Sequence, residues 1–329
     1  MRGIGLIVFT LIWSGVVTIF DYSIGRDAFH QFESSRYPVA TGTVTRSEVK
    51  TSTGSKGGTT YSALIEYKFK VGERTFFGKR LRYLNPPGGW AVATALVAAH
   101  PVGATVEVHC HPEDPGDSLL LPGIEGRDLM LAVFTAPFNA IMLGFWLGSG
   151  AWLRERLFRP VAGGVKIIRG GMTTRVRLPS HSAVIWGLVA TGGLGFVSIF
   201  VVGISTKMDP SLGLVTGTIA VVYLGGLGVY LWQRQKINSG IDDLVINEAA
   251  RTLELPPTQG RKQRMTTNLA DIEKLKVETR VHTSSKGGDS YTYQPTLALR
   301  GARTQALADW SDKLKAEDFT AWLRQQLGL

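Results

Sequence analysis

The sequence predicts a multi-pass α-helical membrane protein with four transmembrane helices and two soluble domains that contain β-strands. Four uncharged runs are long enough, at ~1.5 Å per helical residue, to cross a hydrocarbon core of ~30 Å. The segments outside these runs are rich in β-branched and aromatic residues and partly alternate, which is typical of strands. Basic residues gather in one loop between the runs and therefore predict the orientation of the helices.

The composition limits the class of protein. The chain has 329 residues, is 44% hydrophobic and carries a formal net charge of +10. Residues 154–182 hold seven basic residues and one acidic residue, so most of the charge comes from this loop rather than from a basic domain. Nucleic-acid binding is therefore not expected. Cys110 is the single cysteine, which excludes an intramolecular disulfide.

Residues 3–20 form the first uncharged run, directly behind Arg2. The run is longer than the apolar part of a usual signal peptide, and no small-x-small cleavage site follows it. We therefore favour an uncleaved signal anchor, transmembrane helix 1, over a cleaved signal peptide. With Arg2 on the cytoplasmic side, the next segment is predicted to lie outside the cytoplasm.

Residues 37–122 are predicted to form this extracytoplasmic, β-rich domain. Glycine-rich turn sequences, which favour hairpins, separate its strand-like segments, and residues 90–100 form an alanine-rich helix. The turn at 53–58 and the break at 85–89 are the clearest of these punctuating sequences. The predicted strands are residues 39–50, 61–71, 75–83 and 105–111.

A set of glycine, proline, aromatic and valine residues at fixed spacings runs through this domain. They are Tyr37, Pro38, Thr41, Gly42, Val44, Tyr67, Phe69, Val71, Gly72, Thr75, Gly78, Pro101, Gly103, Val106, Val108, Pro112, Asp114, Pro115, Ser118 and Leu120. The pattern resembles a bacterial membrane-protein family described as domain of unknown function 3592. The resemblance implies a β-rich segment flanked by membrane helices, and it implies no activity. The sequence departs from the family where Tyr37 replaces a more usual Trp and where His109, Cys110 and His111 replace an aromatic pair.

Three more transmembrane helices are predicted over residues 129–153, 183–206 and 212–232. Between the first two lies the basic loop 154–182, which contains a β-hairpin pattern at 165–178. Positive charge on this loop places it in the cytoplasm. The charge pattern as a whole predicts a protein of the bacterial inner membrane with its N- and C-termini in the cytoplasm.

Residues 240–329 are predicted to form a cytoplasmic β domain that ends in an amphipathic helix, residues 315–327. This architecture resembles a small pleckstrin-homology-like domain, a likeness that carries no function by itself. Only about five strands follow residue 243, and the hairpin 165–178 is a candidate for two more. The turns at 55–58 and 285–288 share the sequence Ser-Lys-Gly-Gly, for which convergent turn chemistry is favoured over duplication.

Few residues suggest chemistry. His109 and His111 are two apart on a predicted strand, and Asp114 and His100 lie near them in sequence. A third metal ligand at a fixed spacing is missing. Polar positions on the solvent-facing side of a strand explain the two histidines better than a metal site does.

Asn139, beside Pro137, is expected to form an interhelical hydrogen bond. No predicted span contains an ionisable residue, which argues against coupled transport. We assign no catalytic, cofactor-binding or metal residues and expect no cofactor, because no catalytic motif is found.

The predicted function is a non-enzymatic binding, scaffold or assembly protein of the bacterial envelope. Its expected partners are the lipid bilayer and envelope proteins, with no nucleic acid. The alternative is a pore or a subunit of a transport complex, and a metal-dependent enzyme built on His109 and His111 is a distant third. The sequence leaves the ligand, the partner and the oligomeric state open.

Overall fold

In the computed structural model the chain forms two compact units, residues 1–149 with 187–228, and residues 150–186 with 229–329. Outside the described residues lie positions 54–58 of the predicted turn at 53–58, the predicted turn at 285–288, most of the predicted break at 85–89, and Arg159. The described residues are 2–53, 59–84, 89–158, 161–179, 182–258, 261–283, 289–301 and 303–329.

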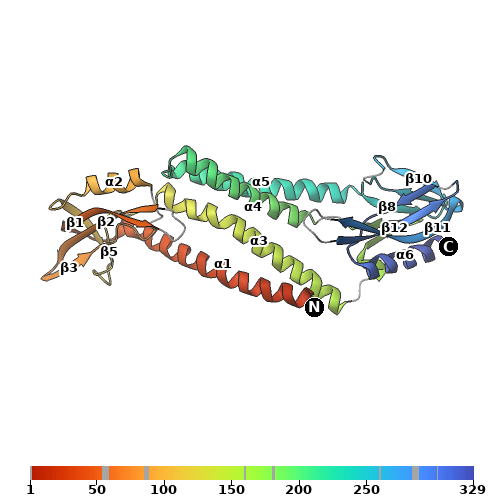
Figure 1. Cartoon of the computed structure of the whole chain (residues 1–329), viewed down its shortest axis with the longest axis horizontal. Helices are drawn as coiled ribbons and strands as arrows, with labels where there is room; N and C mark the ends of the chain where they lie inside the picture. Colours follow the sequence, from red (N-terminus) through yellow and green to blue (C-terminus); the bar gives the residue numbers. More distant parts are fainter. Residues whose placement is uncertain are drawn as a thin grey trace. The chain divides into compact units, whose positions relative to one another are not determined.

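Four helices of the described part of the chain are long and apolar enough to cross a membrane (Figure 1). Three of them, α1, α3 and α5, contain the predicted runs and continue beyond them, whereas α4 ends one residue before the predicted end of its run. Backbone hydrogen bonding and helix propensity do not require apolar side chains, so a helix does not end where hydrophobicity ends. The helices are α1 (Arg2–Glu33), α3 (Gly126–Leu157), α4 (Ala183–Ser205) and α5 (Leu212–Asn238).

The first β domain is an antiparallel sheet in the order β3-β2-β1-β4-β5, with the helix α2 (Trp90–Ala99) packed against β1 and β2. All four predicted strands are present. The third is shorter than predicted, because the chain leaves the sheet after Gly78 and the carbonyl of Arg80 accepts a hydrogen bond from Tyr67 instead. The strands are β1 (Val39–Thr53), β2 (Thr59–Val71), β3 (Arg74–Gly78), β4 (Thr105–Cys110) and β5 (Ser118–Leu119).

The ring of Tyr67 is fully buried at the centre of this domain and explains several residues of the recurring pattern. It lies across Gly78, where an added Cβ atom would overlap the ring. Its hydroxyl also lies 3.0 Å from the carbonyl oxygen of Ser118, and burial raises the pKa of Tyr67 to about 12. Gly42 likewise leaves room for Val108, whose side chain would lie 2.7 Å from an added Cβ atom. These pattern residues therefore serve packing.

The second β domain contains two antiparallel sheets, in the orders β10-β9-β8-β7-β6 and β11-β12-β13, and the helix α6 (Lys313–Leu327). The first sheet consists of β6 (Lys166–Gly170), β7 (Thr173–Arg177), β8 (Asp243–Asn247), β9 (Thr252–Leu255) and β10 (Met265–Asn268). The second consists of β11 (Ile272–Thr283), β12 (Asp289–Leu299) and β13 (Arg303–Ala306).

The hairpin β6–β7 completes the first of these sheets. Strand β7 pairs antiparallel with β8, from Thr173 opposite Asn247 to Arg177 opposite Asp243, and Arg177 also forms an ion pair with the buried carboxylate of Asp243 at 3.4 Å. This confirms the hypothesis that the basic loop supplies two strands to the C-terminal domain. The adjacent strands β7 and β8 are therefore separated in sequence by the whole of α4 and α5.

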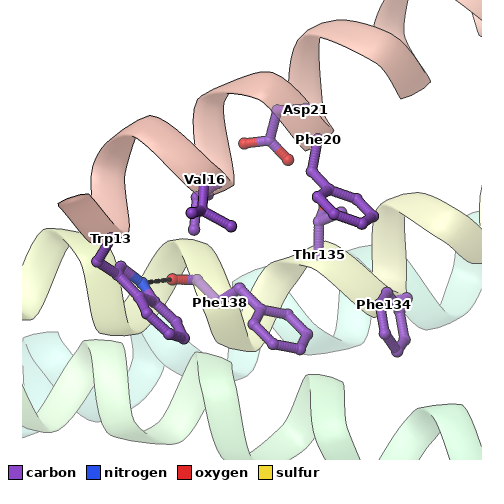
Figure 2. A pocket seen from close by; sticks show the side chains of 8 residues that line it. Trp13, Val16, Phe20, Asp21, Phe134, Thr135 and Phe138 are labelled. Carbon is purple, nitrogen blue, oxygen red and sulfur yellow. Dashed lines mark hydrogen bonds between the residues drawn. The ribbon is translucent and has the colours of Figure 1, made fainter.

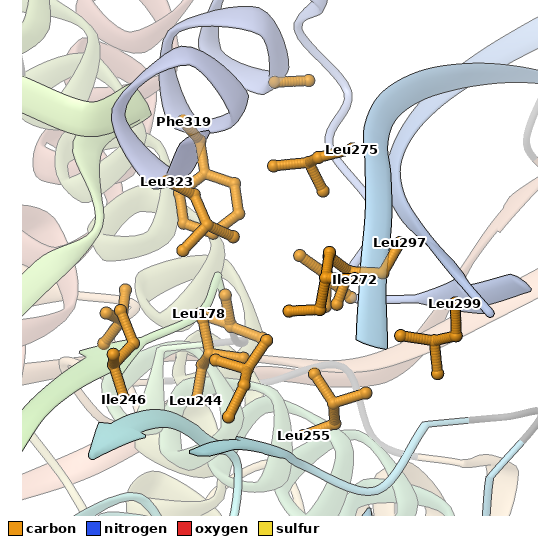
Figure 3. Packing of buried hydrophobic residues seen from close by; sticks show 14 of the residues in the cluster. Leu178, Leu244, Ile246, Leu255, Ile272, Leu275, Leu297, Leu299, Phe319 and Leu323 are labelled. Carbon is orange, nitrogen blue, oxygen red and sulfur yellow. The ribbon is translucent and has the colours of Figure 1, made fainter. Parts of the chain in front are cut away.

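The core of the second β domain lies between the sheets and α6 (Figure 3). Phe319 and Leu323 of α6 are fully buried against Leu244, Leu275 and Leu297, as the amphipathic pattern predicts. The side chain of Asp312 caps the N-terminus of α6 by accepting a hydrogen bond from the backbone N–H of Leu314 at 2.9 Å. Gly328, in the left-handed conformation, ends the helix.

Candidate functional site

The predicted histidine pair does not gather the neighbours that a metal site needs. Among the described residues there is no group of three or more His, Cys, Asp or Glu side chains that would hold a metal ion. Asp114 instead accepts a hydrogen bond from the backbone N–H of Gly116 at 3.0 Å, which shapes the turn before β5. His109 and His111 are partly buried, and the ring of His111 packs edge-on against Tyr37. Burial lowers the pKa of His109.

A buried ionic network joins the first β domain to α3. Arg82 follows β3, and 2% of its side chain is exposed. Its Nη2 atom lies 2.5 Å from Oδ2 of Asp128, a fully buried carboxylate in the first turn of α3. Its Nη1 atom lies 2.8 Å from Oε1 of Glu125, and Nη2 also donates to the carbonyl of Gly123 at 2.6 Å. Each charge therefore has an opposite charge beside it, as burial requires.

A second set of buried contacts joins the same segment to α1. Gln31 is fully buried near the end of α1, and its Nε2 atom donates to the carbonyls of Leu121 at 2.9 Å and Gly123 at 2.7 Å. Its Oε1 atom accepts from the backbone N–H of Tyr83 at 2.8 Å, next to Arg82. The amide group thus connects three segments. The first β domain is held on both α1 and α3, rather than suspended from a flexible linker.

Polar contacts also run along the seam between α1 and α3. Thr10 and Ser149, both buried, have their hydroxyl oxygens 2.9 Å apart. Further along, Asn139 donates from Nδ2 to Oδ1 of Asp21 at 3.3 Å. The interhelical hydrogen bond predicted for Asn139 is confirmed, and its partner is an acidic residue.

Asp21 lies in α1 directly after the predicted span 3–20, which itself holds no acidic or basic residue. The predicted span ended at residue 20, whereas α1 continues to Glu33 and places Asp21 beside Asn139, the eleventh residue of the run 129–153. The middle of α4 packs on the same part of α3, since added Cβ atoms at Gly192 and Gly195 would lie 3.3 Å from Ala140 and 3.2 Å from Ala136. Asp21 is therefore level with the middle of α4.

A pocket of about 310 Å³ opens beside Asp21 between α1 and α3 (Figure 2). Its accessible wall is formed by apolar atoms and is rich in aromatic rings, although Asp21 and Thr135 are among the residues that line it. The indole N–H of Trp13 donates to the carbonyl of Phe138 at 3.4 Å, which fixes one ring in the wall. The lining residues are Trp13, Val16, Val17, Phe20, Asp21, Phe134, Thr135 and Phe138.

A polar pocket of about 400 Å³ lies in the second β domain, near the start of α6. Two of its basic side chains have acidic partners. Lys315 lies 2.6 Å from Glu155, and Arg177 lies 3.4 Å from Asp243. These ion pairs explain part of the charged lining as structural contacts within the domain.

Comparison with known proteins identifies one region of the chain. Residues 40–125 match a family model described as "Domain of unknown function (DUF3592)", which confirms the resemblance derived from the sequence pattern. The matched range contains Arg82 and Glu125, whereas Asp21, Gln31 and Asp128 lie outside it. No curated protein and no solved structure matches the chain.

Sequence reasoning missed Arg82, Gln31 and Asp21. Arg82 and Gln31 are polar residues in polar stretches, and nothing in their local sequence marks them as buried. Asp21 carried one usable signal, because an acidic residue directly after an uncharged run is a candidate for the same helix. Asn139 inside the run 129–153 was the second signal, since a buried amide needs a polar partner.

Proposed function

We propose that this chain is a multi-pass protein of the bacterial inner membrane that acts by non-enzymatic binding, as a scaffold or assembly protein. In this proposal α1, α3, α4 and α5 cross the membrane, the first β domain lies outside the cytoplasm, and the second β domain lies in the cytoplasm. Both soluble domains bind partners. The observation that carries the proposal is the buried network around Arg82 and Gln31, which fixes the first β domain on two helices.

A rigid attachment distinguishes this arrangement from a domain on a tether. Arg82 and Asp128 are both buried, so an arrangement that separated them would leave a buried charge without its partner, and the ion pair therefore favours the one arrangement that keeps them together. A partner bound to the first β domain therefore acts on α1 and α3 directly.

The strand order and architecture of the second β domain support the same proposal. Strands β7 and β8 are neighbours in one sheet, and α4 and α5 lie between them in sequence. Two antiparallel sheets and a C-terminal helix give a pleckstrin-homology-like architecture, which we propose as its fold class. The seven basic residues of the loop 154–182 favour the cytoplasmic side, where anionic lipids attract them.

Asp21 favours one alternative, a pore or a subunit of a transport complex. Ionisable residues at membrane depth commonly mark pathways for ions or substrates. Asp21 lies level with the middle of α4, so membrane insertion of these helices would place its carboxylate far from bulk water. Flux of a solute through reconstituted protein, lost in an Asp21→Asn variant, would favour this alternative over the scaffold.

The orientation is tested with introduced cysteines. Cys110 is 3% exposed and burial raises its pKa, so the native chain is expected to stay unlabelled by a membrane-impermeant maleimide. A Ser52→Cys variant, changed at an exposed position of β1, is expected to react in intact cells. An Ala249→Cys variant, changed in the exposed turn between β8 and β9, is expected to react only after permeabilisation. The opposite pattern would reverse the proposed topology.

The binding role is tested by photo-crosslinking in cells. A photoreactive amino acid at Phe77, which is 75% exposed in the first β domain, is expected to give a discrete protein adduct, as is one at Met172, which is 61% exposed in the second. The buried position Phe69 serves as the control in the same domain as Phe77. Absence of adducts at both exposed positions, in cells where the protein is folded and labelled, would contradict a binding role.

A further inference from the structure

We infer that two copies of this chain associate through strand β11, which pairs antiparallel with β11 of a second copy and joins the sheets β11-β12-β13 of both copies into one. Strand β11 lies at the edge of its sheet, because β12 is its only neighbouring strand among the described residues. The inference goes beyond the proposed binding role, which includes no second copy, and it does not depend on the orientation of the helices.

The first argument is a row of free backbone groups along β11. Tyr293 of β12 exchanges both of its backbone hydrogen bonds with Trp310, at 2.8 and 2.9 Å, and Thr279 lies opposite Tyr293 on β11. Hydrogen-bonded and non-hydrogen-bonded pairs alternate along an antiparallel ladder, so the N–H and C=O groups of Val277, Thr279 and Val281 point away from β12. No residue of the described part of the chain forms a hydrogen bond with these groups.

The edge of β11 is covered near its start and open beyond. Nε of Arg324, from α6, donates to the carbonyl of Leu275 at 3.1 Å, and this carbonyl belongs to the same outward-pointing row. Further along the strand Thr279 is exposed and Val281 is 54% exposed. Among the described residues β11 has 12 residues, whereas the other edge strands, β3, β5, β6, β10 and β13, have five or fewer. A long free edge favours pairing with another strand.

The second argument is the charge pattern of β11, which selects a second copy as the pairing strand. Side chains alternate across a strand, and Val277 packs on the core, so Glu278 and Arg280 lie on the opposite face. In an antiparallel pair centred on Thr279, Glu278 of each copy lies opposite Arg280 of the other. Two pairs of opposite charge then form across the interface. On the core side of the sheet the same register sets Val277 opposite Val281.

Arg280 is free to make this contact. Its side chain is exposed, and it forms no ion pair with any described residue. Glu278 lies 2.6 Å from Lys276 on its own strand, and both of these side chains are partly exposed, at 38% and 46%. A carboxylate accepts hydrogen bonds from more than one donor, so Glu278 is able to bind Arg280 of the second copy while it keeps Lys276.

Registers shifted by one or two residues are less favourable. Centred on Glu278, the pair would set this carboxylate opposite its own copy and Lys276 opposite Arg280, and like charges directly opposite are destabilising. Centred on Val277, it would set Lys274 opposite Arg280, and it would need the carbonyl that α6 already occupies. The register centred on Thr279 is therefore the one that we propose.

Cysteine cross-linking of the purified full chain in detergent tests the register. In a Thr279→Cys variant the two copies of residue 279 face each other with Cα atoms about 5.5 Å apart, within reach of a disulfide. Oxidation with copper phenanthroline is expected to give a covalent dimer. The control Lys274→Cys, at an exposed position of the same strand, sets its two copies about 33 Å apart and is expected to stay monomeric. Equal cross-linking of the two variants would overturn the inference.

A charge exchange tests whether the second strand is a copy of β11. Sedimentation equilibrium of the full chain in detergent measures the dimer dissociation constant. Glu278→Arg and Arg280→Glu each set like charges opposite each other, and each is expected to raise this constant at least about tenfold. The double variant Glu278→Arg with Arg280→Glu restores opposite charges and is expected to recover the dimer. A monomeric native chain, or a double variant as weak as the single ones, would overturn the inference.

A proline at the centre of the edge gives a test through the backbone. Thr279→Pro removes an N–H group that no described residue binds, so the sheet is expected to survive. The dimer is expected to be lost, because the facing pair loses its hydrogen bonds. An unchanged dissociation constant for Thr279→Pro would also overturn the inference. Each of these failures would leave the binding role intact, since that role concerns other proteins.

Discussion

Replacing Arg82 with methionine is expected to lower the free energy of unfolding of the first unit by about 3–5 kcal/mol. The substitution removes the guanidinium and leaves the fully buried carboxylate of Asp128 without its cation. An uncompensated buried charge costs far more than the lost contact itself. Thermal unfolding of the purified full chain in detergent, compared with the native chain, measures the change.

Two further variants separate the buried pair from a general loss of charge. Arg46→Met removes an exposed ion pair with Glu48, in which both side chains are about half exposed, and is expected to cost less than about 1 kcal/mol. The double variant Arg82→Met with Asp128→Leu removes both buried charges and is expected to be more stable than Arg82→Met alone. If Arg82→Met and Arg46→Met destabilise equally, the buried network does not hold the domain on α3.

Replacing Gly163 with alanine is expected to destabilise the second β domain by about 2–4 kcal/mol. Gly163 lies in the short helical turn Val161–Gly164 that packs against α6, with a φ of +69°. An added Cβ atom would overlap the carbonyl oxygen of Lys315, which belongs to the backbone of α6 and cannot rotate away. Protection of α6 amides in hydrogen exchange measures the loss.

Gly171 provides the matched control. Its φ of +59° is close to that of Gly163, but an added Cβ atom there meets no atom within 4 Å. Gly171→Ala is therefore expected to cost only the strain of the left-handed conformation, about 1–2 kcal/mol. Equal losses for Gly163→Ala and Gly171→Ala would show that backbone strain alone matters and that the close approach to α6 does not.

The helices and strands were largely predictable because their signals are local. Four uncharged runs marked the long helices, and the alternation of β-branched and aromatic residues marked the strands of both domains. The limits of the elements were less predictable. The apolar run of α1 ends at Phe20 while the helix continues to Glu33, because hydrophobicity and helix propensity are different properties.

The candidate site was not predictable because it depends on the stagger of helices. Asp21 and Asn139 are 118 residues apart, and neither residue indicates which turn of α3 meets which turn of α1. The network around Arg82 has the same origin, since its partners come from the segment 123–125 and from the start of α3. The pairing of β7 with β8 was open to prediction only as a hypothesis, because a strand pattern does not name its neighbour.

The insertion of α4 and α5 between two neighbouring strands sets an order of events during synthesis. When β7 leaves the ribosome, its partner β8 is not yet made, and the chain must complete both helices before the sheet is able to close. Until then β7 presents an unpaired edge, which proteases and aggregation both exploit. A chain whose helix pair fails to form is therefore expected to keep an incomplete sheet in the second β domain.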